Sequence, residues 1–312
     1  MQNGVILLPS LICLPSRARH RHRSACGLRR STARRNSFAS FPIDHRRRGN
    51  AQGKFPAHSP PTLEVTRSLF LSNCLMGEKK CYIFQFRNSP LEEQEQQAFC
   101  RYAPGGSVVF VNVLRGEEKR KFSWENAGGI IFAGAGDYSV TSSPSWLPRL
   151  QEIAREAVAR DVPFLGVCLG HQILALAFGA EVQSLREQSE LGTVRIRINS
   201  EGLASKLFAG MPEEIAVMAG HNDSVVAVPP GIKVLAGNAR CPIQAMQIVG
   251  KCAYGVQFHP ELTEKDFQAR LEYYRDYYIE KSVDIDALVR ERALPTNDEL
   301  VLKNFFSLCS YS

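Results

Sequence analysis

The sequence lacks the features of a membrane or secreted protein. Its longest apolar run near the start, Val5 to Leu14, is interrupted by Pro9 and is about half as long as a membrane helix must be. The first four residues carry no positive charge, which argues against a secretory signal. We therefore expect no membrane partner.

Patterns for metal sites and disulfides are also missing. The nine cysteines include no Cys-x-x-Cys pair, and an odd number is untypical of a disulfide framework. The seven histidines are scattered and form no metal-ligand spacing. The sequence implies neither a metal nor another cofactor, and it favours a reducing, cytoplasmic environment.

No motif for nucleotide chemistry is present. The chain has no Gly-x-x-x-x-Gly-Lys-Ser/Thr loop and no Ser-Gly-Gly phosphate loop. With 312 residues, of which 44% are hydrophobic and 22% charged, it can bury one full-sized core. We expect one catalytic domain and no ATP-dependent synthase beside it.

Acidic residues are nearly absent from the first part of the chain. Residues 1–54 carry a net charge of +11, so the whole-chain charge of +7 leaves about −4 for the remainder. A core of that sign argues against nucleic-acid binding.

We expect a basic extension over 1–75 and a catalytic domain over 76–312. The extension is interpreted in three ways: a plastid or mitochondrial transit peptide within residues 1–60, a disordered arm, or a segment upstream of a true start at Met76.

Short β-rich runs alternate with helical patterns in the core. The predicted strands lie at 81–86, 108–114, 129–133 and 162–167, and the predicted helices at 91–102, 146–159 and 171–179. Such alternation indicates an α/β fold, a doubly wound, largely parallel sheet with helices on both faces. A second group of short strands is expected at 194–198, 215–218, 233–236, 245–248 and 253–258.

Two helices are expected near the end of the chain. The first covers residues 264–278 and repeats large side chains at a helical spacing, with Tyr274 and Tyr278 among them; this stripe is interpreted as core rather than as a ligand surface. The second covers residues 297–308 and should dock through Leu302, Phe305 and Phe306.

One short segment carries a strong catalytic signal. Residues 164–172 read Phe-Leu-Gly-Val-Cys-Leu-Gly-His-Gln, an apolar strand that turns directly into a helix. Gly166 and Gly170 allow neighbouring backbone to pass close to the turn, as in a nucleophile elbow. Cys168 would lie at this turn, where the positive end of the helix dipole favours the nucleophilic thiolate over the thiol.

A second segment supplies groups that a cysteine nucleophile needs. Residues 254–261 form an apolar strand that ends in His259 and Glu261, with Pro260 between them. Cysteine catalysis requires a base within hydrogen-bond reach and a further group that orients the base. His259 and Glu261 match these two roles, and the strand order predicts that His259 returns to the edge of the sheet where Cys168 lies.

These motifs resemble the class I glutamine amidotransferase domains, in the GMP-synthetase-like branch, over roughly residues 80 to 310. The matching segments are Gly-Val-Cys-Leu-Gly-His-Gln at 166–172, Gly-Val-Gln-Phe-His-Pro-Glu at 255–261, and His-Asn-Asp-Ser-Val at 221–225. The resemblance implies a catalytic triad of Cys168, His259 and Glu261.

The same resemblance implies roles for five further residues. The backbone amides of Leu169 and Gly134 would form the oxyanion hole; Gly134 lies in an Ala-Gly-Ala-Gly segment where family members often have Gly-Gly-Pro. Gln172, Asn222 and Asp223 would bind the amino-acid end of the substrate. A surface position for the Gln172 amide is the alternative.

The expected reaction is hydrolysis of a γ-glutamyl amide through a γ-glutamyl thioester. The middle loop and the segment Lys-Asn-Phe-Phe at 303–306 resemble free-standing members of the family, which include γ-glutamyl peptidases. Two alternatives stay open: a glutaminase subunit that feeds ammonia to a separate synthase, and an inactive binding module on the same fold. A small-molecule γ-glutamyl substrate is expected, whereas a synthase partner is not implied.

Overall fold

A computed structural model describes residues 78–280, 283–290 and 298–311. The predicted basic extension over 1–75 lies outside these residues. All of the described residues belong to one unit of the chain. Within them, no helix is both long and apolar enough to cross a membrane.

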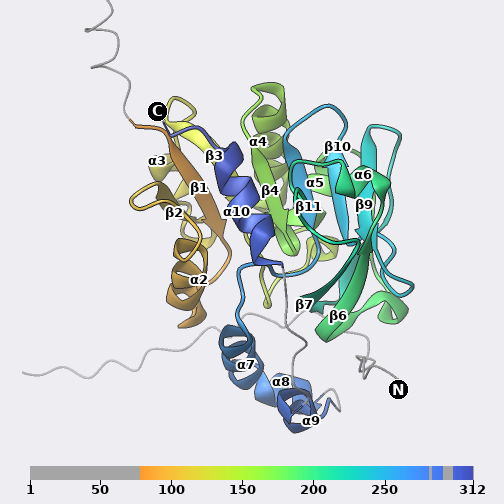
Figure 1. Cartoon of the computed structure of the whole chain (residues 1–312). Helices are drawn as coiled ribbons and strands as arrows, with labels where there is room; N and C mark the ends of the chain where they lie inside the picture. Colours follow the sequence, from red (N-terminus) through yellow and green to blue (C-terminus); the bar gives the residue numbers. More distant parts are fainter. Residues whose placement is uncertain (1–77, 281–282, 291–297, 312) are drawn as a thin grey trace, which may run out of the picture. The chain divides into compact units, whose positions relative to one another are not determined.

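Strands and helices alternate over residues 80–177, whereas strands predominate over residues 181–256 (Figure 1). The strands are β1 (Lys80–Gln85), β2 (Val108–Asn112), β3 (Ala127–Phe132), β4 (Phe164–Val167), β5 (Glu181–Ser184), β6 (Glu190–Ile198), β7 (Glu214–His221), β8 (Asp223–Ala227), β9 (Ile232–Gly237), β10 (Ala245–Ile248) and β11 (Ala253–Val256). The helices are α2 (Leu91–Cys100), α3 (Glu118–Lys121), α4 (Leu147–Ala159), α5 (Leu169–Ala177), α6 (Ser200–Leu203), α7 (Glu264–Tyr273), α8 (Arg275–Glu280), α9 (Ile285–Arg290) and α10 (Glu299–Leu308). Single 3-10 turns lie at η1 (Val113–Arg115), η2 (Val140–Ser142) and η3 (Arg186–Gln188).

The large sheet has nine strands in the order β2-β1-β3-β4-β11-β10-β9-β6-β7. The first five are parallel to one another. The rest continue the sheet in antiparallel pairs. A separate antiparallel pair is formed by β5 and β8, and β8 begins at Asp223, one of the predicted substrate residues. The pattern agrees with the predicted α/β class, and the antiparallel strands extend its parallel half.

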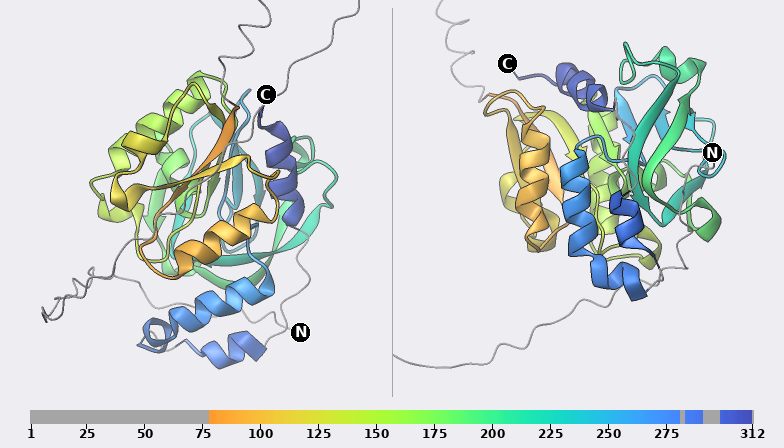
Figure 2. Two further views of the ribbon diagram at one scale, coloured as in Figure 1. Left: turned by 90° about the vertical axis from the view of Figure 1, so that its left-hand side faces the viewer. Right: turned by 60° about the horizontal axis from the view of Figure 1, so that its bottom comes forward.

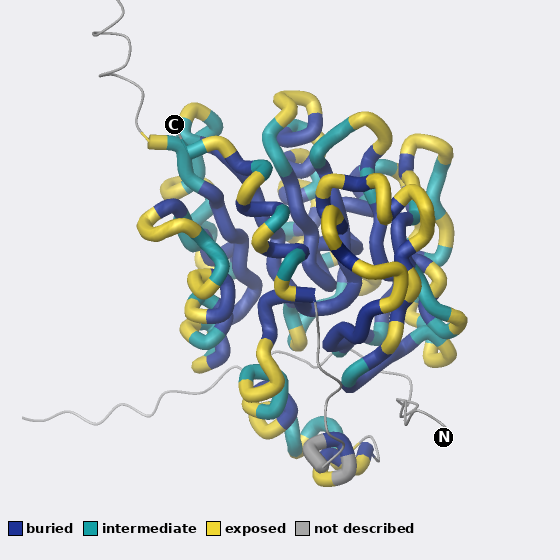
Figure 3. Tube along the Cα trace, in the orientation of Figure 1, coloured by how far each residue is buried: buried dark blue, intermediate teal, exposed yellow. Residues whose placement is uncertain are grey.

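Alternate strand residues enter two different cores, because successive side chains of a strand point to opposite faces. On β1, Cys81 and Ile83 join a cluster that includes α10 residues, whereas Tyr82 and Phe84 join one that includes α4 and α5 residues. Figure 2 shows α10 and α4 on opposite sides of the sheet. The buried positions of the central strands stand out as a continuous dark core in Figure 3. Helices therefore cover both faces, as predicted.

The C-terminal helices differ partly from the prediction. The docking helix forms as α10, and Leu302, Phe305 and Phe306 are buried. The helix expected over 264–278 is instead two helices, α7 and α8, because the first ends at Tyr274.

Candidate active site

Cys168 lies at a sharp turn between β4 and α5. Its backbone has φ +50° and ψ −102°, a conformation that a side-chain-bearing residue rarely adopts. A Cβ at Gly166 would lie 2.3 Å from the Gly170 carbonyl oxygen, and a Cβ at Gly170 would lie 2.1 Å from the Phe132 carbonyl oxygen. Only glycine fits at both positions, so the structure has the strained geometry of a nucleophile elbow.

The Cys168 turn is hydrogen-bonded to the neighbouring strand β11, and the first backbone amides of α5 follow the cysteine directly. The Cys168 N–H donates to the Val256 carbonyl at 2.8 Å, which continues the β4–β11 pairing. Leu169 is the first residue of α5, and the first N–H groups of a helix have no acceptor within that helix. The Leu169 N–H therefore has no acceptor within α5.

His259 and Glu261 follow β11, the strand beside β4, so the parallel pairing brings them to the elbow. The His259 N–H donates to the Met218 carbonyl at 2.8 Å, which fixes the backbone of this segment. The His259 Nδ1 lies 2.8 Å from Glu261 Oε1, and both side chains are buried. His259 thus has its Nδ1 engaged by the carboxylate.

The charges of this pair stabilise each other. Burial opposes a charge on the His259 ring, but Glu261 and a hydrogen bond to Cys168 outweigh it and raise the pKa of His259 to about 9. Burial would raise the pKa of Glu261, yet His259 and the Arg270 guanidinium lower it to about 2. At neutral pH the ring is protonated and the carboxylate ionised.

Gly134 follows β3 and lies against both reacting side chains. A Cβ at this position would lie 2.6 Å from His259 Cε1 and 3.3 Å from Cys168 Cβ. The two side chains therefore converge on one small space that the glycine leaves open. The sequence-predicted triad and both predicted oxyanion residues are adjacent in the structure.

A pocket opens beside Cys168 and Leu169. Its polar wall includes Gln172, Asn222 and Asp223. The Gln172 amide is only 3% exposed and donates to the Asp223 carbonyl at 2.9 Å, so the surface alternative is wrong for this residue. Ser139, which was not predicted, also lines the pocket and donates a short hydrogen bond to the Asp223 carboxylate.

The other notable wall of the pocket is aromatic. Tyr274, Tyr277 and Tyr278 line it. The stripe interpreted as core does pack as one: Phe267 and Tyr278 lie against the same small hydrophobic cluster as Leu271, while Tyr274 and Tyr278 also reach the pocket.

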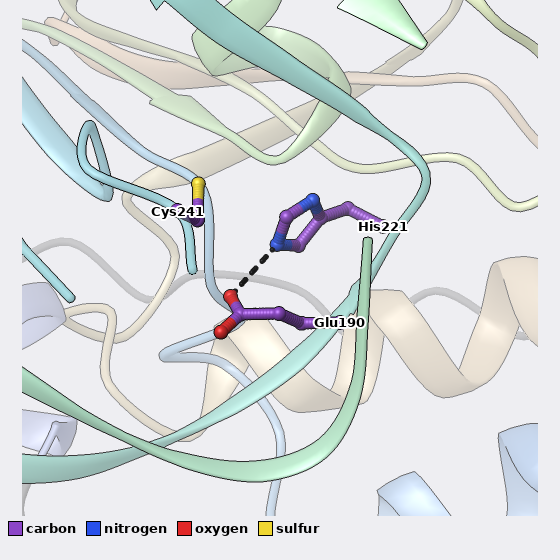
Figure 4. A group of neighbouring side chains, drawn as sticks. All are labelled: Glu190, His221 and Cys241. Atoms are coloured by element: carbon purple, nitrogen blue, oxygen red, sulfur yellow. Dashed lines mark hydrogen bonds and ion pairs between the residues drawn. The ribbon is translucent and has the colours of Figure 1, made fainter. Parts of the chain in front are cut away.

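The structure also assembles a cluster that the scattered histidines did not suggest. Glu190, His221 and Cys241 place ligand-type atoms within 4.8 Å of one another (Figure 4). Both Glu190 oxygens are engaged: Asn238 Nδ2 donates to Oε1 at 2.8 Å, and the other oxygen accepts from Gln244 and lies 3.1 Å from His221 Nε2. Burial, followed by the nearby Glu190, raises the pKa of Cys241 to about 12.

The hydrogen bonds of this cluster favour a support for the predicted substrate loop over a metal centre. Both Glu190 oxygens and both ring nitrogens of His221 already lie within hydrogen-bond distance of protein atoms. His221 Nδ1 lies 3.2 Å from the Asp223 carbonyl oxygen, so the ring connects Glu190 to the predicted substrate residues. The sequence missed this role because the three residues are far apart along the chain.

The comparisons with known proteins agree with the fold and the motifs. Residues 105–275 match the family described as Glutamine amidotransferase class-I. The chain belongs to this family. The resemblance inferred from the sequence is thereby confirmed.

Several relatives are named as parts of a GMP synthase. The chain is 38% identical over 149 residues to the glutamine-hydrolysing GMP synthase subunit of Thermococcus kodakarensis, a match that covers 48% of this chain and 73% of the relative. The protein of the same name from Archaeoglobus fulgidus is 44% identical over 119 residues, which cover 38% of this chain and 61% of the relative.

Solved structures confirm the fold class. A glutamine amidotransferase from Thermotoga maritima matches with a TM-score of 0.58 at 22% identity, covering 74% of this chain and 96% of the other. A glutamine amido transferase from Methylobacillus flagellatus matches with a TM-score of 0.57 at 21% identity, covering 76% and 97%.

Proposed function

We propose that the protein hydrolyses a γ-glutamyl amide bond, with Cys168 as nucleophile, His259 as general acid and base, and Glu261 as the group that orients His259. The observation that carries this proposal is the convergence of the strained elbow with the hydrogen-bonded His259–Glu261 pair. The same convergence argues against an inactive binding module, because a binding function has no use for it.

The reaction follows from the charges of the site. The Cys168 thiolate attacks the γ-carbonyl carbon, and the Leu169 and Gly134 amides receive the resulting oxyanion. The charged His259 gives its proton to the leaving nitrogen, and the C–N bond breaks to leave a γ-glutamyl thioester. Neutral His259 then takes a proton from water, which attacks the thioester and releases the γ-carboxylate. Cys168 is regenerated as the leaving thiolate.

The polar wall of the pocket suits the amino-acid end of the substrate. A γ-glutamyl group carries an α-ammonium and an α-carboxylate. The Asp223 carboxylate can pair with the ammonium, and the Asn222 and Gln172 amides can contact either group. Ser139 and the His221–Glu190 pair hold this loop in place.

The aromatic wall favours a leaving group larger than ammonia. The three pocket tyrosines, Tyr274, Tyr277 and Tyr278, offer apolar area and hydroxyl groups that a leaving group larger than ammonia could contact. We therefore propose a γ-glutamyl peptidase or a related amide hydrolase that acts alone.

The names of the relatives favour a second candidate. A glutamine-hydrolysing subunit of GMP synthase implies a separate synthase subunit, and this chain could supply ammonia in the same way. The two candidates share the chemistry at Cys168 and differ in the leaving group and the partner.

A product screen distinguishes the candidates. The purified chain is incubated with glutamine, glutathione and a glutathione conjugate, and released glutamate is measured. We expect the bulkier amides to be hydrolysed at least as well as glutamine. Activity that appears only after a second polypeptide is added, and only with glutamine, would favour the ammonia-donating role.

Cys168→Ala tests the nucleophile. We expect a loss of activity on the order of a thousandfold or more with an unchanged melting temperature. The matched control is Cys252→Ala, a half-buried cysteine outside the pocket, which should retain activity. Near-normal hydrolysis by Cys168→Ala would exclude the proposed mechanism.

A further inference from the structure

A row of buried charges continues behind the proposed triad. Arg270 lies near the end of α7 and is 7% exposed. Its Nη1 donates to Glu261 Oε1 at 3.3 Å and lies 3.5 Å from His259 Nδ1. The guanidinium thus contacts the same carboxylate oxygen that engages the histidine ring.

Arg270 is itself held by a second ion pair. Its Nη2 lies 3.6 Å from Oε2 of Glu95, a fully buried residue of α2. The same Glu95 oxygen accepts from Arg87 Nε at 2.8 Å, and Gln85 Nε2 donates to the other oxygen at 2.9 Å. Arg87, Glu95, Arg270 and Glu261 therefore alternate in charge, two from residues 87–95 and two from residues 261–270.

Stability alone is a weak reason for such a network. Bringing several charges out of water costs free energy, and well-packed apolar residues of similar size are often equally stable. The geometry instead ties the network to His259, because Arg270 contacts the group that orients the ring. A guanidinium keeps its charge, so its effect on Glu261 persists at every working pH.

We propose that Arg270 is a positioning residue for the reaction: it fixes the Glu261 carboxylate and, as a cation, offsets the pull of Glu261 on the His259 proton, while Glu95 holds Arg270 in place. This inference rests on the proposed triad. Glu261 Oε2 has no hydrogen-bond partner among the described residues, so His259 and Arg270 together define the carboxylate's orientation.

The sign of the effect follows from the charges. A positive charge near an ionisable group favours its deprotonated form, so loss of Arg270 should move the pH profile of the site to higher pH. Loss of the Glu95 charge should move it to lower pH. The other charged or titratable groups around this network are Cys168, Tyr274, Tyr278, Asp137, and Arg101, which donates to the Glu261 carbonyl oxygen.

The test measures Cys168 directly. The full chain is treated with iodoacetamide between pH 5 and 10, and the alkylation rate of the Cys168 peptide is followed by mass spectrometry. For Arg270→Met we expect the pH at which the alkylation rate is half-maximal to shift upward by about one pH unit. At a fixed pH below this midpoint, the rate should therefore fall on the order of tenfold. Arg270→Lys should recover part of the shift. Lys265→Met removes an exposed charge from the same helix and should match the wild type.

Two outcomes would overturn the inference. An unchanged profile in folded Arg270→Met removes any electrostatic role, and an equal loss of rate at every pH indicates only a structural one. If Arg270→Met does not fold, Glu95→Gln decides, since a downward shift supports the network and an unchanged profile rejects it.

Failure of the proposed function is distinguishable from failure of this inference. It would appear in the wild type, as a Cys168 peptide no more reactive than that of Cys100, an exposed cysteine of α2. The comparison with Cys100 is made before any variant is interpreted.

Discussion

Gly134 is the position where one added methyl group would most directly disturb the proposed reaction. A Cβ there would lie 2.6 Å from His259 Cε1, whereas two carbon atoms in good contact are about 3.5 to 4.0 Å apart. The ring would have to move by about 1 Å. Because Glu261 binds its Nδ1 and the side chain is buried, that movement would change its alignment with Cys168.

The expected cost can be expressed as a rate. A misplacement of about 1 Å in a catalytic group can reduce the rate roughly a hundredfold. This factor corresponds to about 2.7 kcal/mol in the activation free energy. We expect Gly134→Ala to lower kcat by this amount and to change KM little, because Gln172, Asn222 and Asp223 stay in place.

Steady-state hydrolysis of a γ-glutamyl amide, together with a melting curve, tests the expectation. The matched control is Gly231→Ala, since a Cβ at that loop position would meet nothing within 4 Å. The control should keep both activity and stability. Should folded Gly134→Ala work within about twofold of the wild type, the convergence of His259 and Cys168 on this glycine is not the reacting geometry.

Two further predictions concern pH and the leaving group. Since the pKa of His259 is raised to about 9, the ring holds its proton below that pH, and kcat/KM should fall as pH rises through about 9; a profile flat to pH 10 would contradict this. Tyr277→Ala should raise KM for a bulky γ-glutamyl amide by roughly fivefold, about 1 kcal/mol of aromatic contact, and leave KM for glutamine unchanged. The control is Tyr273→Ala, because Tyr273 is 48% exposed and lies outside the pocket. Equal effects of both variants on the KM of both substrates would argue against an aromatic leaving-group site.

Local backbone chemistry explains why the elbow was predictable. A strand that turns into a helix at Cys168 needs glycines where other backbone comes close, and Gly166 and Gly170 show those approaches at 2.3 and 2.1 Å. The His259–Glu261 pair is equally local, because Pro260 links two residues whose side chains meet. Motifs of this kind carry their own geometry, so short stretches of sequence suffice to identify them.

The alternation of strands and helices also predicted the parallel core well. Boundaries moved by a few residues, and β5, β8 and the separation of α7 from α8 were not foreseen. The β8 segment was interpreted as part of a loop motif, although Asp223–Ala227 pairs with β5. Periodicity shows which face of an element is buried, but the partner that covers it depends on residues elsewhere in the chain.

By itself, the sequence determined the fold class, the nucleophile elbow and the residues of the proposed triad, because each depends on nearby residues. The tertiary structure decided what surrounds them: the tyrosine wall of the pocket, the Glu190–His221 support of the predicted substrate loop, and Arg270 behind Glu261. These contacts join elements that are distant in sequence. The charged and aromatic side chains affect one another only after folding packs them together and excludes the water between them.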